Sequence, residues 1–334
     1  MVSIIIPVYN VAPYIEACLS SVMRQTYKGA MECIIVDDCG SDESIAIAER
    51  MVSSYEGSIR FVILHHSHNR GLSAARNTGK TAAQGEYIYY LDSDDEITDD
   101  CIEKLIAPVS KDPDIEMVQG NTKMCSQRRY DPYTKQYPIK CTKSNEEARA
   151  CFYRKHLILV NAWNKLIKRS FLIQNNLLFK DGLLWEDHQW LFFLLKHVRS
   201  IYFVSDVTYI YKPRPGSIST GTDKRTKAKH RAVFFHDVLT YLTPHNERTE
   251  MKYIITPFAH YYSRFNKELP EYKNLFSIYW QKAKEHKAYT LNVILAICYI
   301  LGKTKYGWVV IPFIKRMKHP RYIINDIQRI RNQR

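Results

Sequence analysis

The sequence lacks the short motifs that mark several common kinds of site. Its eight cysteines include no Cys-x-x-Cys pair and no Cys/His spacing typical of zinc, which argues against a structural zinc site. No Gly-x-Gly-x-x-Gly occurs, so the dinucleotide-binding fingerprint is missing. Arg76–Thr81 resembles only the end of a P-loop, because Ala74 stands where that motif requires glycine. We therefore expect the cysteines to be free thiols in a reducing compartment. We also expect a functional site that is not a zinc site, a dinucleotide-binding loop or a P-loop.

No apolar run is long enough to cross a bilayer. Val293–Leu301 holds nine apolar residues before two lysines interrupt the pattern, whereas a spanning helix needs about 20. A basic tail follows, with seven Lys/Arg and one Asp over residues 315–334. Two interpretations stay open: a segment lying on a membrane surface, or a core helix hairpin with a solvated basic end. The chain starts directly with a strand-like run and no signal peptide, so we expect a cytoplasmic protein, peripheral at the inner face of the plasma membrane under the first interpretation.

Charge is divided unevenly along the 334 residues, whose formal net charge is +14. Residues 1–100 hold 7 Lys/Arg against 15 Asp/Glu, whereas residues 101–334 hold 41 against 19. The basic part favours an anionic partner, such as a nucleotide phosphate or anionic lipid head groups. A nucleic-acid-binding protein would show tight, salt-sensitive binding of oligonucleotides, and the acidic first hundred residues argue against one.

Hydrophobic patterning over the first hundred residues alternates between strands and helices. Short apolar, β-branched runs predict buried strands, and apolar positions three and four apart predict helices. Such an alternation predicts a parallel sheet covered by helices. The expected strands are 2–8, 33–36, 61–64 and 86–91, and the expected helices are 13–26, 43–54 and 72–84.

Polar residues follow three of the expected strands: Tyr9-Asn10, Asp37-Asp38 and Asp92-Ser93-Asp94. Ligands of open parallel sheets bind outside the carboxyl ends of the strands, so this convergence predicts a site there. Asp92 and Asp94 offer hard oxygen ligands for a divalent cation that neutralises a phosphate leaving group. The alternative is a solvated acidic turn, since Asp and Ser favour turns.

Two further carboxylate positions each allow a functional and a capping role. Asp38 can accept hydrogen bonds from a nucleobase or a ribose; it also suits the N-cap of the next helix, although Asp42 suits that cap better and would leave Asp38 free. Glu186 or Asp187 can take a proton from an acceptor hydroxyl. The same pair can cap a helix expected at 187–197.

Four segments together resemble glycosyltransferase family 2, the bacterial group with a GT-A fold: Ser3–Asn10, Ile35–Asp42, Asn69–Asn77 and Gly85–Asp95. Four motifs in this order at compatible spacing are specific. The resemblance is strong over the first hundred residues, weaker over residues 160–220, and absent after about residue 230. It implies an α/β fold with a mixed, mostly parallel sheet flanked by helices, and we expect a helical extension after it.

The resemblance also implies roles for individual residues. Asp92 and Asp94 would hold a divalent metal, Mn²⁺ or Mg²⁺, and Asp187 would act as the general base. The implied donor-binding residues are Pro7, Tyr9, Asn10, Asp38, Arg76, Asp92 and Ser93, and those implied at the acceptor or at a loop that closes over phosphates are Trp185, Glu186, Arg214 and Asp95. This chain departs from the family at Cys39 and Trp185, where glycine is usual or common.

These observations predict a GT-A domain over residues 1–225, with a nucleotide-sugar half (1–100) and an acceptor half (101–225), and a helical extension over 226–334. The expected activity is the inverting transfer of a sugar from a nucleotide-diphosphate sugar to a glycan or lipid-linked glycan in bacterial surface polysaccharide synthesis. Among the donors, we expect a UDP-sugar. Nucleic acid is not an expected partner. The alternative is a non-catalytic sugar-nucleotide-binding or scaffold subunit of a glycan assembly complex.

Overall fold

Eight strands form one mixed sheet in the computed structural model, which describes residues 1–126, 131–242, 248–265 and 268–285. The strand order is β3-β2-β1-β4-β7-β6-β8-β5. All eight strands belong to a unit that spans Met1–Gly221, and a second unit begins at Thr222. The boundary between the two units lies after Gly221, and the first unit is not divided further. The expected donor half (1–100) and acceptor half (101–225) therefore stay a prediction.

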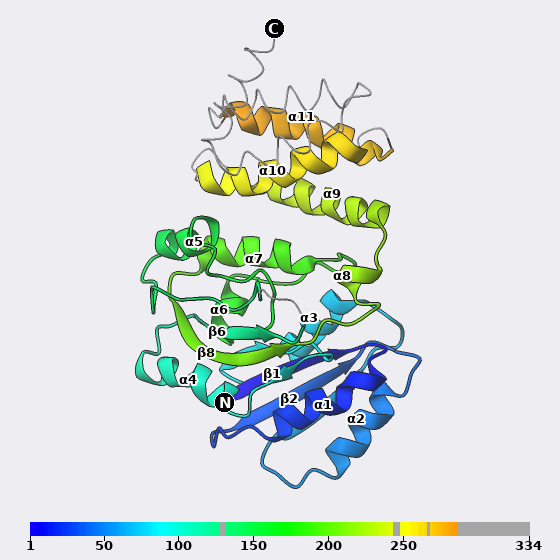
Figure 1. Cartoon of the computed structure of the whole chain (residues 1–334), viewed down its shortest axis with the longest axis vertical. Helices are drawn as coiled ribbons and strands as arrows, with labels where there is room; N and C mark the ends of the chain where they lie inside the picture. Colours follow the sequence, from blue (N-terminus) through cyan, green and yellow to red (C-terminus); the bar gives the residue numbers. More distant parts are fainter. Residues whose placement is uncertain (127–130, 243–247, 266–267, 286–334) are drawn as a thin grey trace. The chain divides into compact units, whose positions relative to one another are not determined.

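The first half of the sheet is the parallel arrangement expected from the sequence (Figure 1). β1 pairs with β2 and β4, and β2 pairs with β3, all in parallel. β1 is buried along its whole length, as its run of β-branched residues predicts. The bounds are β1 Val2–Val8, α1 Ala12–Met23, β2 Met31–Asp37, α2 Ser44–Ser53, β3 Arg60–His65, α3 Leu72–Ala82 and β4 Tyr87–Tyr90.

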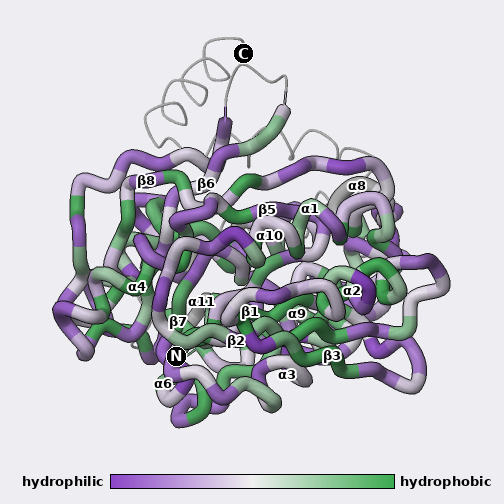
Figure 2. Tube along the Cα trace, turned by 90° about the horizontal axis from the view of Figure 1, so that it is seen from below, coloured by the Kyte–Doolittle hydropathy of each residue, from purple (hydrophilic) through white to green (hydrophobic). Residues whose placement is uncertain are grey.

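Helices cover both faces of these strands. α1 and α2 lie on one face and α3 on the other (Figures 1 and 2). Ile4 and Ile6 belong to the core beneath α1, whereas Ile5 points to the opposite face. There α3 approaches β1 so closely that a Cβ on Gly79 would meet the Ile5 side chain at 2.3 Å. Figure 2 shows hydrophobic residues along the strands and hydrophilic residues in many connecting loops.

The second half of the sheet breaks the parallel pattern. β7 runs antiparallel to both neighbours, β4 and β6, while β6 and β8 are parallel and β5 pairs antiparallel with β8. The expected mixed, mostly parallel sheet is thereby confirmed. The bounds are β5 Glu96–Ile97, α4 Cys101–Lys111, β6 Met117–Met124, α5 Asn145–Tyr153, β7 Lys165–Lys168, α6 Arg169–Gln174, α7 Glu186–His197, β8 Ile201–Tyr211 and α8 Ile218–Gly221.

The described part of the second unit is helical, as expected. It comprises α9 Lys224–Tyr241, α10 Arg248–Phe265 and α11 Pro270–Glu285. Asp223 caps α9 by accepting hydrogen bonds from the backbone N–H groups of Arg225 and Thr226. Aromatic rings join the helices, with Phe258 stacked on Tyr279 at 4.3 Å between centroids. No helix among the described residues is long and apolar enough to cross a membrane. The apolar-basic segment after residue 292 lies outside the described residues.

Candidate active site

The three polar strand ends predicted from the sequence lie at one edge of the sheet. β1, β2 and β4 are parallel neighbours, so their carboxyl ends share that edge. Tyr9 and Asn10 follow β1, Asp38 follows β2, and Asp92 lies two residues beyond the end of β4. Hydrogen bonds hold the ends together: the Asp38 N–H donates to the Val8 carbonyl at 2.9 Å, and the Leu91 N–H to the Ile5 carbonyl at 3.0 Å.

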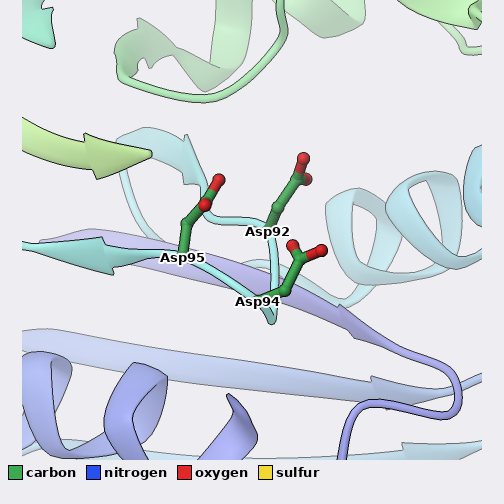
Figure 3. A group of neighbouring side chains, drawn as sticks. All are labelled: Asp92, Asp94 and Asp95. Atoms are coloured by element: carbon green, nitrogen blue, oxygen red, sulfur yellow. The ribbon is translucent and has the colours of Figure 1, made fainter. Parts of the chain in front are cut away.

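Three carboxylates project from the turn after β4 to the same side (Figure 3). One ligand oxygen each from Asp92, Asp94 and Asp95 lies within 4.8 Å of the others. Asp95 is the most buried of the three. It accepts hydrogen bonds from the Tyr209 hydroxyl and the Lys212 N–H, both at 2.7 Å. Ser93 between them is buried. This is the turn that the sequence singles out as a metal site.

The donor set of this turn fits a hard divalent cation. Burial and the neighbouring Asp92 carboxylate raise the pKa of Asp94, and burial with Asp92 and Asp94 raises the pKa of Asp95 well above its usual value. A bound cation offsets that repulsion, and carboxylate oxygens are the ligands that Mg²⁺ and Mn²⁺ prefer. Arg76 contacts only Oδ1 of Asp92, and Arg214 only Oδ2 of Asp94. The other oxygen of each is without a side-chain hydrogen bond among the described residues, so these two are the better ligand candidates.

A buried arginine joins this turn to α7. The Arg76 side chain is 1% exposed, and its Nη2 donates to Oδ1 of Asp92 at 2.7 Å. Its Nη1 donates to Oε1 of Glu186 at 2.5 Å and to Oδ1 of Asp187 at 3.0 Å. Together these four residues form the Arg76 cluster. The acidic partners raise the pKa of Arg76 despite its burial, so the guanidinium stays charged. It thereby fixes the separation between a metal-ligand candidate and the general-base candidate.

Glu186 and Asp187 lie in the first turn of α7, which begins one residue earlier than expected. Burial and the Asp187 charge raise the pKa of Glu186 to about 8. Burial raises the pKa of Asp187 as well, against the opposing charges of Arg76 and Lys165. A carboxylate with a raised pKa is a stronger base than an exposed one. No side-chain hydrogen bond caps α7, so the pair serves the Arg76 cluster rather than the cap position.

As expected from the sequence, Asp38 does not cap the next helix, but its carboxylate has partners within the protein. Its Oδ1 accepts from the Arg70 N–H at 2.8 Å, and its Oδ2 accepts from the Gly71 N–H at 2.7 Å. His66 Nδ1 lies 2.7 Å from Oδ1, and His66 Nε2 lies 2.9 Å from the Thr78 hydroxyl. The side chain thus fixes the loop that enters α3. His66 was missed, because a histidine just beyond a strand has no motif of its own.

The remaining donor-side residues differ in exposure. Pro7 is buried within β1, opposite Val36 of β2. Tyr9 is 48% exposed, so its ring is open to a ligand. Asn10 has a φ of 52°, and its side-chain oxygen accepts from the Ser41 N–H at 2.8 Å. Asn10 therefore ties the loop after β1 to the loop after β2, and Tyr9 is the more accessible of the two.

Both departures from the family pattern fall at left-handed backbone positions. Cys39 has a φ of 59° and Trp185 a φ of 58°. Only glycine adopts this region without steric cost, which explains why glycine is frequent there in the family. Trp185 precedes Glu186 directly, so its backbone sets how α7 enters the Arg76 cluster.

The loop after β8 reaches the acidic turn. Arg214 Nε donates to Oδ2 of Asp94 at 2.5 Å, and its guanidinium lies 5.2 Å from the Tyr14 ring centroid. Lys212 pairs with Glu96 beside the same turn. Two basic side chains therefore border the predicted metal site, where phosphate oxygens would need positive charge.

The comparisons with known proteins agree on one family. The model of "Glycosyl transferase family 2" matches residues 3–174. "Uncharacterized glycosyltransferase EpsJ" of Bacillus subtilis is 32% identical over 229 residues, which cover 66% of this chain and 63% of EpsJ. "Cholesterol galactosyltransferase" of Borreliella burgdorferi is 28% identical over 244 residues, 68% of this chain and 64% of that protein. The chain thus spans less than two thirds of the length of these two relatives.

Solved structures share the fold. The crystal structure of S. aureus TarS 1-349 in complex with UDP-GlcNAc superposes with a TM-score of 0.71 at 19% identity, covering 94% of this chain and 91% of TarS 1-349. The mannosyltransferase PcManGT from Pyrobaculum calidifontis, in complex with GDP-Man and Mn²⁺, gives a TM-score of 0.55 at 18% identity, covering 92% and 82%. At such identities the likeness bears on the fold alone, and the mixed α/β sheet with flanking helices is that of the GT-A glycosyltransferases.

Proposed function

The chain belongs to glycosyltransferase family 2, and from this premise we propose that it is an inverting, metal-dependent glycosyltransferase that uses a nucleotide-diphosphate sugar. The observation that carries the proposal is the Arg76 cluster. One buried guanidinium holds Asp92, a metal-ligand candidate, and Asp187, a base candidate, in a fixed arrangement. A transferase needs this arrangement, because the leaving group and the acceptor react at the same anomeric carbon.

The acidic turn is the proposed leaving-group end of the site. Asp92 and Asp94 would hold Mn²⁺ or Mg²⁺, and such an ion neutralises the diphosphate that departs. Arg214 and Lys212 lie beside this turn and supply further positive charge to phosphate oxygens. Tyr9, with its exposed ring, is proposed to contact the nucleoside.

Asp187 is the proposed general base. Its carboxylate accepts the proton of the acceptor hydroxyl while the hydroxyl oxygen bonds to the anomeric carbon. The bond from that carbon to the diphosphate oxygen breaks in the same step, so a single displacement inverts the anomeric configuration. Arg76 orients Asp187 for this transfer through its hydrogen bond to Oδ1. Glu186, protonated near neutral pH, adds no second competing negative charge there.

We propose a UDP-sugar as donor, supported by the fold shared with a structure in complex with UDP-GlcNAc. The proposed acceptor is a glycan or lipid-linked glycan of bacterial surface polysaccharide. Peripheral contact with the membrane stays a proposal of the same kind. The GDP-Man complex of PcManGT makes GDP-sugars the second class of donor to compare.

Thermal-shift measurements with UDP-, GDP- and dTDP-sugars test the donor and metal assignments together. Ligand that binds the folded state raises Tm by mass action. We expect a donor-dependent increase only with Mn²⁺ or Mg²⁺ present, reduced in Asp94→Asn. An increase in which Asp94→Asn matches the wild type would contradict the metal assignment. Binding without turnover in any acceptor screen would instead favour a non-catalytic subunit.

A further inference from the structure

One buried aromatic ring packs against all three elements that carry the Arg76 cluster. Phe179, in the segment between α6 and α7, is 2% exposed. Its ring stacks on Trp190 of α7 at 4.8 Å between centroids and meets Tyr90 of β4 edge-on at 5.4 Å. The guanidinium carbon of Arg76, from α3, lies 5.2 Å from the same ring centroid. Phe179 therefore joins α3, the end of β4 and α7 in one contact.

The Arg76 guanidinium is held from two directions. Its two Nη atoms donate to the three carboxylates, whereas its buried Nε has no hydrogen-bond partner among the residues that the structure describes. A guanidinium over an aromatic ring, within about 6 Å of the centroid, gains a cation–π interaction. The Phe179 ring thus supports a guanidinium whose hydrogen bonds all lie at its Nη end.

Asn77 of α3 holds Phe179 through its backbone. The Asn77 Oδ1 accepts from the Phe179 N–H at 3.0 Å, and its Nδ2 donates to the Phe179 carbonyl at 2.7 Å. The same Nδ2 donates to Oδ1 of Asp181 at 3.3 Å. One turn further along α3, Lys80 Nζ donates to the Leu177 carbonyl at 3.1 Å. Two bonds to one residue fix both its place and its direction, so Asn77 determines where the Phe179 ring lies.

α3 therefore reaches α7 by two routes from adjacent residues. Arg76 contacts the carboxylates of Glu186 and Asp187 directly. Asn77 acts on the same helix indirectly, because it holds the ring against which Arg76 and α7 both pack. A change at Asn77 should thus reach the carboxylates without touching them.

We propose that Asn77 is a positioning residue for the general base: by fixing Phe179, it holds Arg76 against the first turn of α7. The position of the Asp187 carboxylate relative to Asp92 depends on this support. The inference rests on the proposed function, and it assigns Asn77 no contact with donor or acceptor. An asparagine that only stabilised the fold would affect Tm and leave kcat of the folded protein unchanged.

The chain offers a matched control in Asn175. This side chain is half-buried like that of Asn77, and its Nδ2 also donates to a phenylalanine carbonyl, that of Phe171, at 2.8 Å. The bond stays local, because Phe171 lies four residues earlier in α6. Asn175→Ala therefore removes an amide that holds a phenylalanine backbone without changing the support of Phe179.

The first experiment needs no ligand and no turnover. In the full chain labelled with ¹⁵N-arginine, the Arg76 guanidinium signals are assigned by their loss in Arg76→Lys. We expect them to shift or broaden in Asn77→Ala and in Phe179→Leu, because the guanidinium loses its support, and to stay unchanged in Asn175→Ala. Unchanged Arg76 signals in Asn77→Ala, or an equal change in Asn175→Ala, would overturn the inference. Failure of the proposed function would show separately, as absence of sugar transfer by the wild type.

The second experiment measures kinetics with the donor that raises Tm in the thermal-shift screen. Displacement of a catalytic group by about 1 Å can cost about 10²-fold in rate, so we expect Asn77→Ala to lower kcat about 10-fold or more. The KM for the donor should stay within about twofold of the wild type, because the base does not hold the donor. Asn175→Ala should leave both constants unchanged.

A double-mutant cycle tests the route through Phe179. Residues that act through one another give effects that do not add in free energy. Asn77→Ala combined with Phe179→Leu should therefore lower kcat no further than the more damaging single variant. Losses that multiply in the double variant would overturn the route through Phe179.

Discussion

Asp38 follows β2 and Asp92 of the Arg76 cluster follows β4 at the same edge of the sheet, yet their charges are met in different ways. Asp38 is held by the N–H groups of Arg70 and Gly71 and by His66, so its hydrogen-bonding capacity is used within the protein. The Arg76 cluster instead places three carboxylates on one guanidinium. The first arrangement is complete without a ligand. The Arg76 cluster keeps an excess of negative charge, which can bind a metal ion and accept a transferred proton.

Removing the proposed base should have the largest effect. Asp187→Asn keeps the side-chain shape but cannot accept the proton, so we expect kcat to fall by about 10²–10⁴-fold. Donor binding should stay within about threefold of the wild type. Steady-state kinetics measure the first, and titration with donor and metal measures the second. Asp181→Asn is the control, because the Asp181 carboxylate is exposed and its ion pair with Arg70 is long, at 4.0 Å. Equal losses of kcat in both variants would contradict the assignment of Asp187 as the base.

Removing the shared cation should come next and act on stability. Arg76→Met leaves buried carboxylates without their partner, which costs about 3–5 kcal/mol of unfolding free energy. Denaturant unfolding measures this cost. Arg24→Met is the matched control, since Arg24 pairs with Asp99 at an exposed site and should change stability by at most about 1 kcal/mol. Equal unfolding free energies for the Arg76 and Arg24 variants would contradict the claim that Arg76 compensates buried charge in its cluster.

The loop held by Asp38 should respond differently from the cluster. Asp38→Ala leaves the N–H groups of Arg70 and Gly71 unpaired, so we expect a loss of about 1–3 kcal/mol in unfolding free energy. Asp206→Ala, at an exposed carboxylate, provides the comparison. A loss of donor affinity with unchanged stability would mean that Asp38 serves the ligand rather than the loop.

The pH dependence of stability gives the smallest expected effect. Glu186 titrates near 8 in the folded chain, above its unfolded value, so the folded state binds that proton more tightly. Its contribution is fully present below about pH 4.5 and is lost as the pH rises from there through about 8. Without metal, we expect Tm to fall by about 2–4 °C per pH unit within this window, equivalent to about 1 kcal/mol per unit. Glu186→Gln should flatten the slope; an unchanged slope would locate the titrating group elsewhere.

Local pattern was sufficient for the parallel half of the fold. The β-branched run of Val2–Val8 and the alternation after it follow from residues close in sequence, so the strands and helices there were predictable. β7 was not, because it is a short strand that pairs antiparallel between β4 and β6, far away in the sequence. The acidic turn was predictable from its place after a buried strand.

The Arg76 cluster could be predicted only in its parts. Arg76, Asp92, Glu186 and Asp187 each belong to a segment that resembles the family, but nothing in the sequence says that one guanidinium contacts all three carboxylates. The hydrogen bonds of Asp38 could not be predicted for a related reason: two of them come from backbone N–H groups, which leave no trace in residue identity. Cys39 and Trp185 depart from the glycine usual in the family, and their positive φ values explain why glycine is usual there.

The anomeric configuration of the product is the most direct test of the central claim, that Asp187 and the metal turn act on opposite sides of one anomeric carbon. ¹H NMR of the product formed from a donor of known configuration in the presence of Mn²⁺ would measure it. A single displacement predicts a β-linked product from an α-linked donor. A product with the donor's configuration, formed at the same rate by Asp187→Asn, would contradict the account.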